Sequence, residues 1–364
     1  MIELLVKVGN KRKWHTASWL EGGTVRMIDQ RLLPFKFKVV SLRKHYETAE
    51  AIKNMTIRGA GSIGAAAAFA CAQAVLECKS KEWPKKALQS FDRIANTRPT
   101  ARDLFFAIER IRNVVEGKQL REAKKAALEE AQKISKEYQE NGERIGELGS
   151  KLIKSGFRIL THCNAGWLAL HDWGSALAPI YFAKRLHRKV FVFVDETRPR
   201  LQGAKLTAWE LANENIEHAI IADNSAGFYM QNQSIDMCIV GADRIAGNGD
   251  VANKIGTYEK AVLAKENGIA FYVAAPLSTF DFDCESGRRI PIEERSEQEV
   301  LYVTGYEKGL RKVRIAPKKS KAKNPAFDVT PAKYIKALIT EHGIIKPKKS
   351  AIKKLAKKCK KVPK

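Results

Sequence analysis

The chain has 364 residues, of which 45% are hydrophobic and 29% charged, and its formal net charge is +25 at pH 7. This is the composition of a soluble globular protein with enough chain for two domains and a sizeable core. No apolar stretch reaches the roughly 20 residues of a membrane span, and the N-terminus lacks the apolar segment of a secretory signal. We therefore predict a cytoplasmic protein that does not contact the membrane, with the alanine-rich run from Ile63 to Leu76 as a buried helix.

The positive charge is concentrated in a C-terminal tail. Between Lys346 and Lys364 there are ten lysines and no acidic residue. The tail has little to bury, so we predict that residues 346–364 are disordered or at most weakly helical. Such a tail either makes a weak contact with RNA or another polyanion or is simply solvated. The sequence shows no aromatic-interleaved basic motif of an RNA-binding module.

The six cysteines form no C-x-x-C pair and are not accompanied by a histidine cluster. The spacing therefore indicates neither a zinc site nor a disulfide framework, and we predict no bound metal. Cys71, Cys78 and Cys238 lie in apolar patterns typical of core packing. Cys163 alone stands in a context that suggests chemistry.

Residues 1 to about 145 are predicted to be mainly helical, with some extended segments near the start. A helix start is indicated in the segment from Thr97 to Arg112, and one or two amphipathic helices are predicted over 116–148. Gly59 to Gly64 match the G-x-G-x-x-G pattern of dinucleotide-binding folds, but a poor strand precedes them and a long helix follows. We therefore predict no nicotinamide or flavin cofactor. Arg58 at this helix start is a candidate phosphate ligand, and the glycines are equally suited to tight helix packing.

From about residue 150 the rhythm changes to short apolar runs separated by helical segments, such as 167–186 and 203–213. This alternation predicts a doubly wound parallel sheet. The runs are continuously apolar, as in strands that are buried on both faces. The predicted strands are 157–162, 189–194, 217–222, 235–242 and 269–275.

Polar residues follow four of these strands. They begin at Cys163, Asp195, Asp223 and Asp243. In open α/β sheets, ligands bind at the carboxyl edge, where such groups gather. The loop after Asp243 is rich in Asn, Gly, Asp and Lys and leads into a helix, which is suited to holding an anion. An ordinary strand–turn–helix corner would look similar.

A long series of motifs resembles one family over about residues 15–345: the methylthioribose-1-phosphate isomerases, in the superfamily that includes the initiation factor 2B regulatory subunits. The motifs are Arg58-Gly59-Ala60, Thr97-Arg98-Pro99-Thr100, Thr161-His162-Cys163-Asn164-Ala165-Gly166, Asp195-Glu196-Thr197-Arg198-Pro199, Leu201-Gln202-Gly203-Ala204, Gly241-Ala242-Asp243-Arg244-Ile245, Asn248-Gly249-Asp250, Ala252-Asn253-Lys254-Ile255-Gly256-Thr257-Tyr258, Ala275-Pro276-Leu277-Ser278-Thr279-Phe280-Asp281, 290–295 and 324–331.

The resemblance implies a helical N-terminal domain (1–145) and a Rossmann-like catalytic domain (146–345), acting as a homodimer without metal or cofactor. It also implies that Cys163 is the catalytic cysteine and Asp243 the catalytic acid. The implied substrate contacts are Arg58, Gly59, Ala60, Arg98, Gln202, Asn253 and Lys254. At 61–62 the chain has Gly-Ser where the family usually has Pro-Ala, which predicts a more flexible turn.

The implied reaction converts an aldose 1-phosphate into a ketose 1-phosphate. Asp243 must be protonated to act on the ring oxygen, so its pKa must be raised by an apolar pocket. Cys163 would act as a base if it is a thiolate, or would stabilise the transition state. A helix start after Cys163 would favour the thiolate. His162 is predicted to be structural, because consecutive strand residues face opposite ways.

Three interpretations remain open from the sequence. The first is isomerisation of 5-methylthioribose 1-phosphate in methionine salvage. The second is a related isomerase that acts on ribose 1,5-bisphosphate or a deoxyribose 1-phosphate and uses the same residues. The third is a non-catalytic regulatory subunit of translation initiation, against which the Cys163/Asp243 pair weighs.

Overall fold

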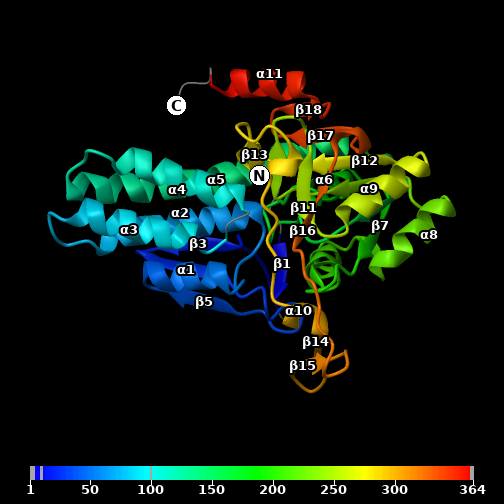
Figure 1. The fold of residues 1–364 in the computed structure, drawn as a ribbon, viewed down its shortest axis with the longest axis horizontal. Coiled ribbons are helices and arrows are strands. Elements are labelled where there is room, and N and C mark those ends of the chain that lie inside the picture. The colour runs from blue at the N-terminus through cyan, green and yellow to red at the C-terminus, as the bar shows by residue number, and fades with distance from the viewer. Residues whose placement is uncertain (1–4, 9–10, 99–100, 361–364) are drawn as a thin grey trace.

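The computed structural model describes residues 5–8, 11–98 and 101–360. A helical N-terminal part and a C-terminal part built on a parallel sheet lie side by side along the longest axis (Figure 1). The predicted mixed α/β architecture is therefore confirmed. Pro99 and Thr100 of the Thr-Arg-Pro-Thr motif and the last four residues of the lysine-rich tail lie outside the described residues.

The N-terminal part is built around one helix that is buried almost throughout. This helix, α2 (Ala60–Glu77), packs against the four other helices of this part, which are α1 (His45–Lys53), α3 (Trp83–Ala95), α4 (Arg102–Val115) and α5 (Leu120–Ser150). By length and composition α2 is apolar enough to cross a membrane, but 83% of it is buried inside the protein. The interior position predicted for the Ile63–Leu76 run is confirmed.

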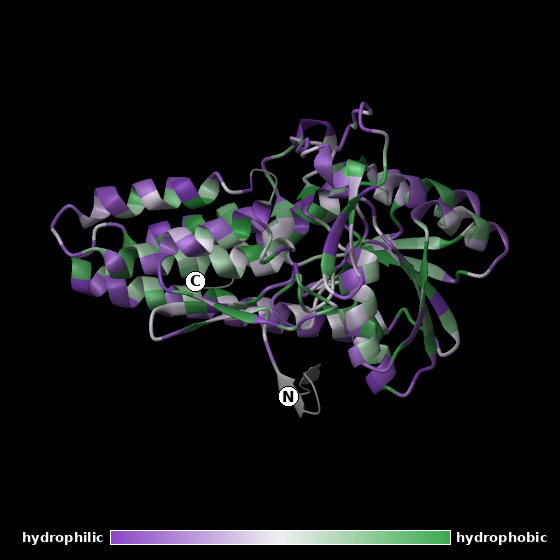
Figure 2. Cartoon of the chain, turned by 90° about the horizontal axis from the view of Figure 1, so that it is seen from below, coloured by the Kyte–Doolittle hydropathy of each residue, from purple (hydrophilic) through white to green (hydrophobic). Residues whose placement is uncertain are grey.

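Helix α5 is one continuous helix because its buried residues recur every three or four positions: Ala123, Ala127, Ala131, Ile134 and Tyr138. It runs without a break across the predicted domain boundary at residue 145, so that boundary stays a prediction. Figure 2 shows the polar outer faces of these helices and the hydrophobic strands of the C-terminal part. A three-stranded antiparallel sheet lies beside α2 and contains β3 (Ser18–Glu21), β4 (Thr24–Ile28) and β5 (Val39–Leu42).

The C-terminal part is organised by a seven-stranded sheet. Its order is β18 (Gly343–Ile345), β17 (Ala337–Thr340), β12 (Ala270–Ala274), β9 (Met237–Val240), β6 (Phe157–Thr161), β7 (Val190–Asp195) and β8 (Glu217–Ile221). All neighbours are parallel except β17 and β18. All five predicted strands are present. Successive residues enter opposite cores, as Ile159 and Leu160 do, so the sheet is buried on both faces.

The helices between these strands differ from prediction in one place. The elements are α6 (Ala178–Arg185), a π-helical turn (Gly203–Thr207) that continues into α7 (Ala208–Asn213), α8 (Ala226–Gln231) and α9 (Thr257–Glu266). The helix predicted over 167–186 is wrong in its first half, which forms turns. His171, Trp173 and Gly174 have positive φ angles of 66°, 46° and 88°, and such residues interrupt a right-handed helix.

Smaller elements complete the fold. A second sheet contains β13 (Phe280–Asp281), β10 (Arg244–Ala246), β11 (Val251–Lys254) and β16 (Phe327–Thr330). Two hairpins are formed by β1 (Leu5–Val8) with β2 (Lys11–Trp14) and by β14 (Tyr302–Tyr306) with β15 (Leu310–Arg314). The short helix α10 (Gln298–Leu301) precedes β14.

Residues 349–360 of the lysine-rich tail are helical in the structure, which is one of the two states expected from the sequence, and disorder of the tail stays a prediction. These residues form helix α11 (Lys349–Lys360), which lies above β18 in Figure 1. Ile352 and Leu355 are three positions apart on one helix face and are buried in the same core as Leu338. Two apolar side chains among the lysines are sufficient to attach the helix to the domain.

Candidate active site

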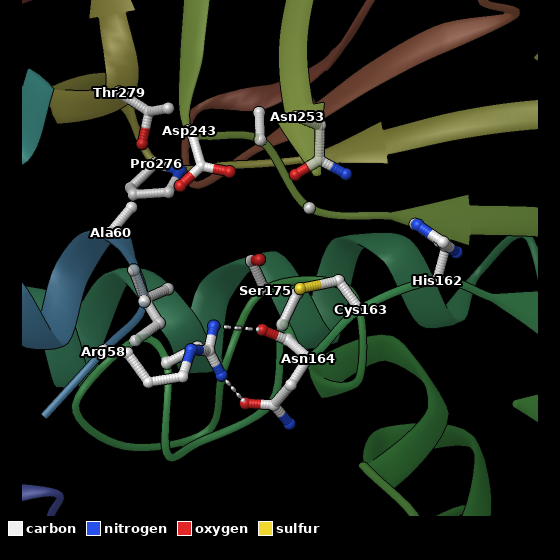
Figure 3. A pocket seen from close by; sticks show the side chains of 16 residues that line it. Arg58, Ala60, His162, Cys163, Asn164, Ser175, Asp243, Asn253, Pro276 and Thr279 are labelled. Carbon is white, nitrogen blue, oxygen red and sulfur yellow. Dashed lines mark hydrogen bonds between the residues drawn. The ribbon is translucent and has the colours of Figure 1, made fainter. Parts of the chain in front are cut away.

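Two adjacent strands bring the predicted catalytic pair together. β6 and β9 are parallel neighbours, with Leu160 opposite Cys238, so the residues that follow them meet at one edge of the sheet. Cys163 and Asp243 both line a pocket of about 40 Å³ at this edge, together with Arg58 and Asn253 (Figure 3). Gly59 and Ala60 line it as well, so six of the nine predicted site residues share this pocket.

The backbone at Cys163 is unusual and is held by two threonines. Its φ angle is 65°, in the left-handed region. The Cys163 N–H donates to Thr197 Oγ1 at 2.8 Å, and its carbonyl accepts from Thr207 Oγ1 at 2.7 Å. Such backbone costs of order 1–3 kcal/mol and persists where its surroundings fix it. Neither threonine contact could be predicted from the local sequence pattern.

The predicted helix start after Cys163 is absent, because the next helix begins at Ala178. Burial raises the pKa of the Cys163 thiol, and the charges of Arg58 and Lys254 oppose that rise. In the ligand-free protein the thiol is therefore favoured over the thiolate.

Asp243 is partly buried in the wall of the pocket, where its N–H donates to the Ala252 carbonyl at 2.9 Å. Burial raises the pKa of its carboxyl group, while Lys254, Arg58 and Arg98 act in the opposite direction. The net shift is upward, which is the direction that a general acid requires.

Arg58 lies at the N-terminus of α2 and faces the pocket from the N-terminal part. It donates through Nη1 to Asn164 Oδ1 and through Nη2 to the Asn164 carbonyl at 2.8 Å (Figure 3). Gly59 has a φ angle of 93°, and a Cβ atom there would lie 2.4 Å from Ala169 Cα. Only glycine fits this approach of α2 to the loop after β6.

Gly61 and Ser62 lie in the first turn of helix α2 and are tightly packed. The prediction of a more flexible turn at these residues is therefore wrong. A Cβ on Gly61 would lie 2.2 Å from Leu170 Cδ1. The Ser62 hydroxyl donates to the Leu168 carbonyl at 2.8 Å and accepts the His171 N–H at 2.7 Å. The element directly before this glycine pattern is helix α1 and not the buried strand that a dinucleotide-binding motif requires.

Sequence reasoning missed Glu210, a buried residue of α7. Its carboxylate accepts from Asn164 Nδ2 at 2.8 Å, the Trp167 N–H at 2.9 Å and the Tyr181 hydroxyl at 2.6 Å. Burial raises its pKa to about 7. Because Asn164 in turn accepts from Arg58, Glu210 positions the arginine of the pocket. A glutamate within a helical pattern gives no signal of this role.

The remaining predicted contacts lie around the pocket instead of lining it. Arg98 is buried, and its Nε lies 3.9 Å from Glu293. The Lys254 Nζ donates to the Ala326 carbonyl at 2.7 Å. Gln202 lines an adjoining cavity of about 500 Å³, which shares Arg58 with the smaller pocket.

The prediction of an anion-binding loop after Asp243 is wrong in one respect. Asn253 and Lys254 belong to strand β11, and the N-terminus of α9 is already occupied by a protein carboxylate. The N–H groups of Gly256 and Tyr258 donate to Asp328 at 2.7 and 3.1 Å. This helix start is therefore closed to a substrate anion.

His162 is turned away from Cys163 and has structural contacts, as predicted. Its Nδ1 lies 2.8 Å from Asp195, which also lies 3.7 Å from the buried Lys260 Nζ. Asp223, close to this pair, accepts the backbone N–H groups of Thr197 and Arg198. These three potential metal ligands are thus engaged with protein donors and a lysine cation, an arrangement that does not fit a metal ion.

A family model for the initiation factor 2 subunit family matches residues 56–347. The chain belongs to this family. Among similar members of the initiation factor 2 subunit family, the methylthioribose-1-phosphate isomerase of Acetivibrio thermocellus is 50% identical over 331 residues, covering 89% of this chain and 95% of the relative. The enzyme of the same name from Thermotoga maritima is 48% identical, with 93% and 96% covered.

Two solved structures of the family are similar to this chain over nearly its whole length. The 5-methylthioribose 1-phosphate isomerase of Pyrococcus horikoshii has a TM-score of 0.82 and 45% identity, covering 95% of this chain and 96% of that one. A structure described as translation initiation factor eIF-2B, subunit delta, from A. fulgidus has a TM-score of 0.79 and 40% identity, covering 94% and 99%.

Proposed function

We propose that this protein is an isomerase that converts 5-methylthioribose 1-phosphate to 5-methylthioribulose 1-phosphate, a step of methionine salvage. The observation that carries the proposal is the shared pocket of Cys163 and Asp243, with Arg58 facing both. Relatives about half identical over most of the chain are methylthioribose-1-phosphate isomerases. No cofactor is required for an internal hydrogen transfer.

Asp243 is proposed to open the sugar ring. In its protonated form it donates to the ring oxygen, the bond between that oxygen and C1 breaks, and the oxygen leaves as a hydroxyl group. The raised pKa of Asp243 keeps this proton available. Replacement of Asp243 by a residue without an acidic proton should block ring opening.

Cys163 is proposed to assist the transfer of hydrogen from C2 to C1. As a thiolate it takes the proton from C2 of the ring-opened cation to give an enediol; protonation at C1 and transfer of the 2-hydroxyl proton to the Asp243 carboxylate then give the ketone. As a thiol it stabilises the transition state of a hydride shift between the two carbons. A substrate with deuterium at C2 separates the routes: solvent hydrogen at C1 of the product indicates the enediol, and complete retention of deuterium indicates the hydride shift.

The phosphate is proposed to bind among the cations that surround Asp243. Arg58, Arg98 and Lys254 all act on the carboxyl group of Asp243 through their charge, and a phosphate dianion is attracted by the same charges. Gln202 and Asn253, with the backbone of Gly59 and Ala60 at the start of α2, are the further proposed contacts. The assignment follows the family resemblance residue by residue.

The apolar part of the pocket favours the methylthio substrate over the related sugar phosphates. Its wall includes Ala60, Ala165, Ala169 and Leu170. An uncharged methylthio group gains free energy on burial against such a wall, whereas a second phosphate there would be desolvated without a partner.

The test is an assay of the purified protein with 5-methylthioribose 1-phosphate and ribose 1,5-bisphosphate in parallel. We expect turnover of the first, and we expect Asp243→Asn and Cys163→Ala each to abolish it while the circular dichroism spectrum is unchanged. Full activity of either variant would overturn the site assignment. Turnover of the bisphosphate alone would replace the substrate.

The similarity to a structure described as an initiation factor subunit leaves a regulatory function as the second candidate. A regulatory subunit would bind the sugar phosphates without converting either. The assay therefore decides between the two when it is combined with a binding measurement on the same sample.

We also propose a cytoplasmic homodimer whose α11 makes weak contacts with polyanions. Edge strand β8 exposes Ile220, and α8 next to it exposes Phe228, so these apolar side chains are available to a second copy. Sedimentation of the wild type and of Phe228→Lys tests the dimer. Elution from a heparin column, with and without residues 346–364, tests the polyanion contact.

A further inference from the structure

The cavity beside the catalytic pocket is strongly basic. Its volume is about 500 Å³, and its charged lining residues are Arg31, Arg58, Arg200, Lys205, Lys312 and Glu299. Five of these side chains are cationic and one is anionic. The cavity adjoins the small pocket at Arg58, so a ligand in it lies next to the catalytic residues.

Ion pairs with protein carboxylates neutralise only part of this charge. Arg31 binds Asp29 through two hydrogen bonds of 2.8 Å, and Arg200 binds Glu299 at 2.8 Å. Glu299 also accepts from Arg295 at 2.7 Å and is therefore shared between two cations. Within the described part of the chain, no carboxylate forms an ion pair with Arg58, Lys205 or Lys312.

The environment of Lys205 is electropositive. It is half-buried on the π-helical turn before α7, and burial together with the charges of Arg200 and Arg198 lowers the pKa of its ammonium group. Lys312 also lines the cavity, on hairpin β14–β15, with its Nζ 4.8 Å from the centre of the Tyr302 ring. An anion between the two lysines would relieve the repulsion among these cations.

We propose that this cavity is a docking site for the phosphomonoester group of a sugar phosphate, with Lys205 and Lys312 supplying its unpaired charge. The proposal rests on the proposed function. The substrate first docks here through its dianionic phosphate and then moves past Arg58 to the catalytic pair. Cations that line a cleft raise the local concentration of an anionic substrate and its association rate.

The volumes of the cavity and of the catalytic pocket support docking in the cavity before entry into the pocket. A pocket of about 40 Å³ accommodates only a few water molecules. A pentose phosphate therefore fits beside Cys163 and Asp243 only if the pocket widens, and Arg58 lines both the pocket and the cavity. Arg58 is held by the two neutral oxygens of Asn164, so an arriving phosphate can compete for its guanidinium group with the advantage of charge.

The test compares two double variants that remove the same net charge. Lys205→Gln/Lys312→Gln removes two of the three unpaired cations of the cavity and leaves Arg58 in place. Lys125→Gln/Lys133→Gln removes two exposed lysines of α5, far from the cavity in sequence and on the outer helix surface. For each protein, kcat and KM are measured with 5-methylthioribose 1-phosphate and, separately, with ribose 1,5-bisphosphate. The ionic strength is varied from about 0.01 M to about 1 M.

We expect the cavity variant to lose about tenfold in kcat/KM at low ionic strength. The loss should lie mainly in KM and should disappear at high ionic strength, whereas the control variant should follow the wild type throughout. Equal salt dependence of all three proteins would overturn the docking site. The measurement with ribose 1,5-bisphosphate shows whether the cavity instead holds a second phosphate group of the substrate. In that case the loss in kcat/KM is confined to ribose 1,5-bisphosphate.

A binding measurement tests the anion site in the cavity independently of isomerase activity. Titration calorimetry with inorganic phosphate, at low ionic strength, should show weaker binding to the cavity variant than to the wild type and the control. If the wild type converts no sugar phosphate but this difference is present, the isomerase proposal fails and the anion site stands. Equal phosphate affinity in all three proteins refutes the site whatever the activity.

Discussion

The imidazole ring of His162 lies between the Asp195 carboxylate and the Ile255 carbonyl, with 2.8 Å from Nδ1 to the first and 2.8 Å from Nε2 to the second. Both partners accept hydrogen bonds, so both ring nitrogens donate only when the ring carries two protons. Otherwise the Asp195 carboxyl must hold the second proton. Either way, His162 links the end of β6, next to Cys163, to the residue after Lys254.

Replacement of His162 by phenylalanine should therefore destabilise the protein, because the Asp195 carboxyl group and the Ile255 carbonyl both lose their hydrogen-bond partner. Each such loss costs about 1–3 kcal/mol. His162→Gln keeps one donor and should fall between Phe and the wild type. Denaturant unfolding measures the difference, and equal stability of the Phe variant and the wild type would show that the bridge contributes nothing.

The Thr197 hydroxyl is predicted to hold Cys163 in its left-handed conformation. It accepts the Cys163 N–H at 2.8 Å and donates to the Asp195 carbonyl at 3.0 Å, while its own backbone has a φ angle of 64°. Thr197→Val removes both bonds, with a loss of about 1–3 kcal/mol in stability and a lower kcat. Thr197→Ser retains the hydroxyl and is the matched control. Similar activities of the two variants would refute the role.

Glu210→Gln should disturb the pocket although Glu210 does not line it. Both carboxylate oxygens accept from donors, Oε1 from Asn164 and Oε2 from the Trp167 N–H. A glutamine amide necessarily places its NH₂ group against one of them, which leaves a buried donor unpaired at a cost of about 1–3 kcal/mol. Because Asn164 then holds Arg58 less firmly, kcat/KM should fall.

The pH dependence of the unfolding free energy tests the raised pKa of the Glu210 carboxyl group. Its pKa is about 7 in the folded protein, above the ordinary value of 4.5. A raised pKa contributes stability that is present below pH 4.5 and is lost as the pH rises toward 7. The Gln variant should lack this decline. If the unfolding free energies of variant and wild type stay parallel between these pH values, Glu210 does not titrate as described.

The thiol of Cys163 should be alkylated slowly at neutral pH. Burial raises its pKa above the ordinary value of 9.0, and only the thiolate reacts. The alkylation rate should rise with pH into the alkaline range. Lys254→Gln removes a charge that lowers this pKa, so the rise should move to higher pH. Mass spectrometry of the labelled peptide separates Cys163 from Cys284, and Cys163→Ala gives the background.

Helix α11 should be held to the domain by its two buried side chains. Ile352→Ser/Leu355→Ser removes an apolar contribution of about 1.5–3 kcal/mol for each residue. Hydrogen exchange of the amides in 349–360 should then accelerate, while the exposed Lys354→Ser leaves it unchanged. Rapid exchange already in the wild type would show that the tail is detached in solution.

The sequence by itself determined the sheet and the chemistry at its edge. The apolar runs of β6, β7, β8, β9 and β12 are long enough to fix a strand buried on both faces, and the residues at their carboxyl ends follow from the direction of the chain. Motifs such as Gly241-Ala242-Asp243 marked the candidate catalytic pair before any contact was known.

Only the tertiary structure decided the contacts between segments distant in sequence. Glu210 supports Arg58 through Asn164 across 46 residues, and Asp328 closes the start of α9 across 72. Thr197 and Thr207 hold the left-handed backbone of Cys163 across 34 and 44 residues. Local propensity and periodicity carry no information about these partners, since each depends on which loops the sheet order brings together.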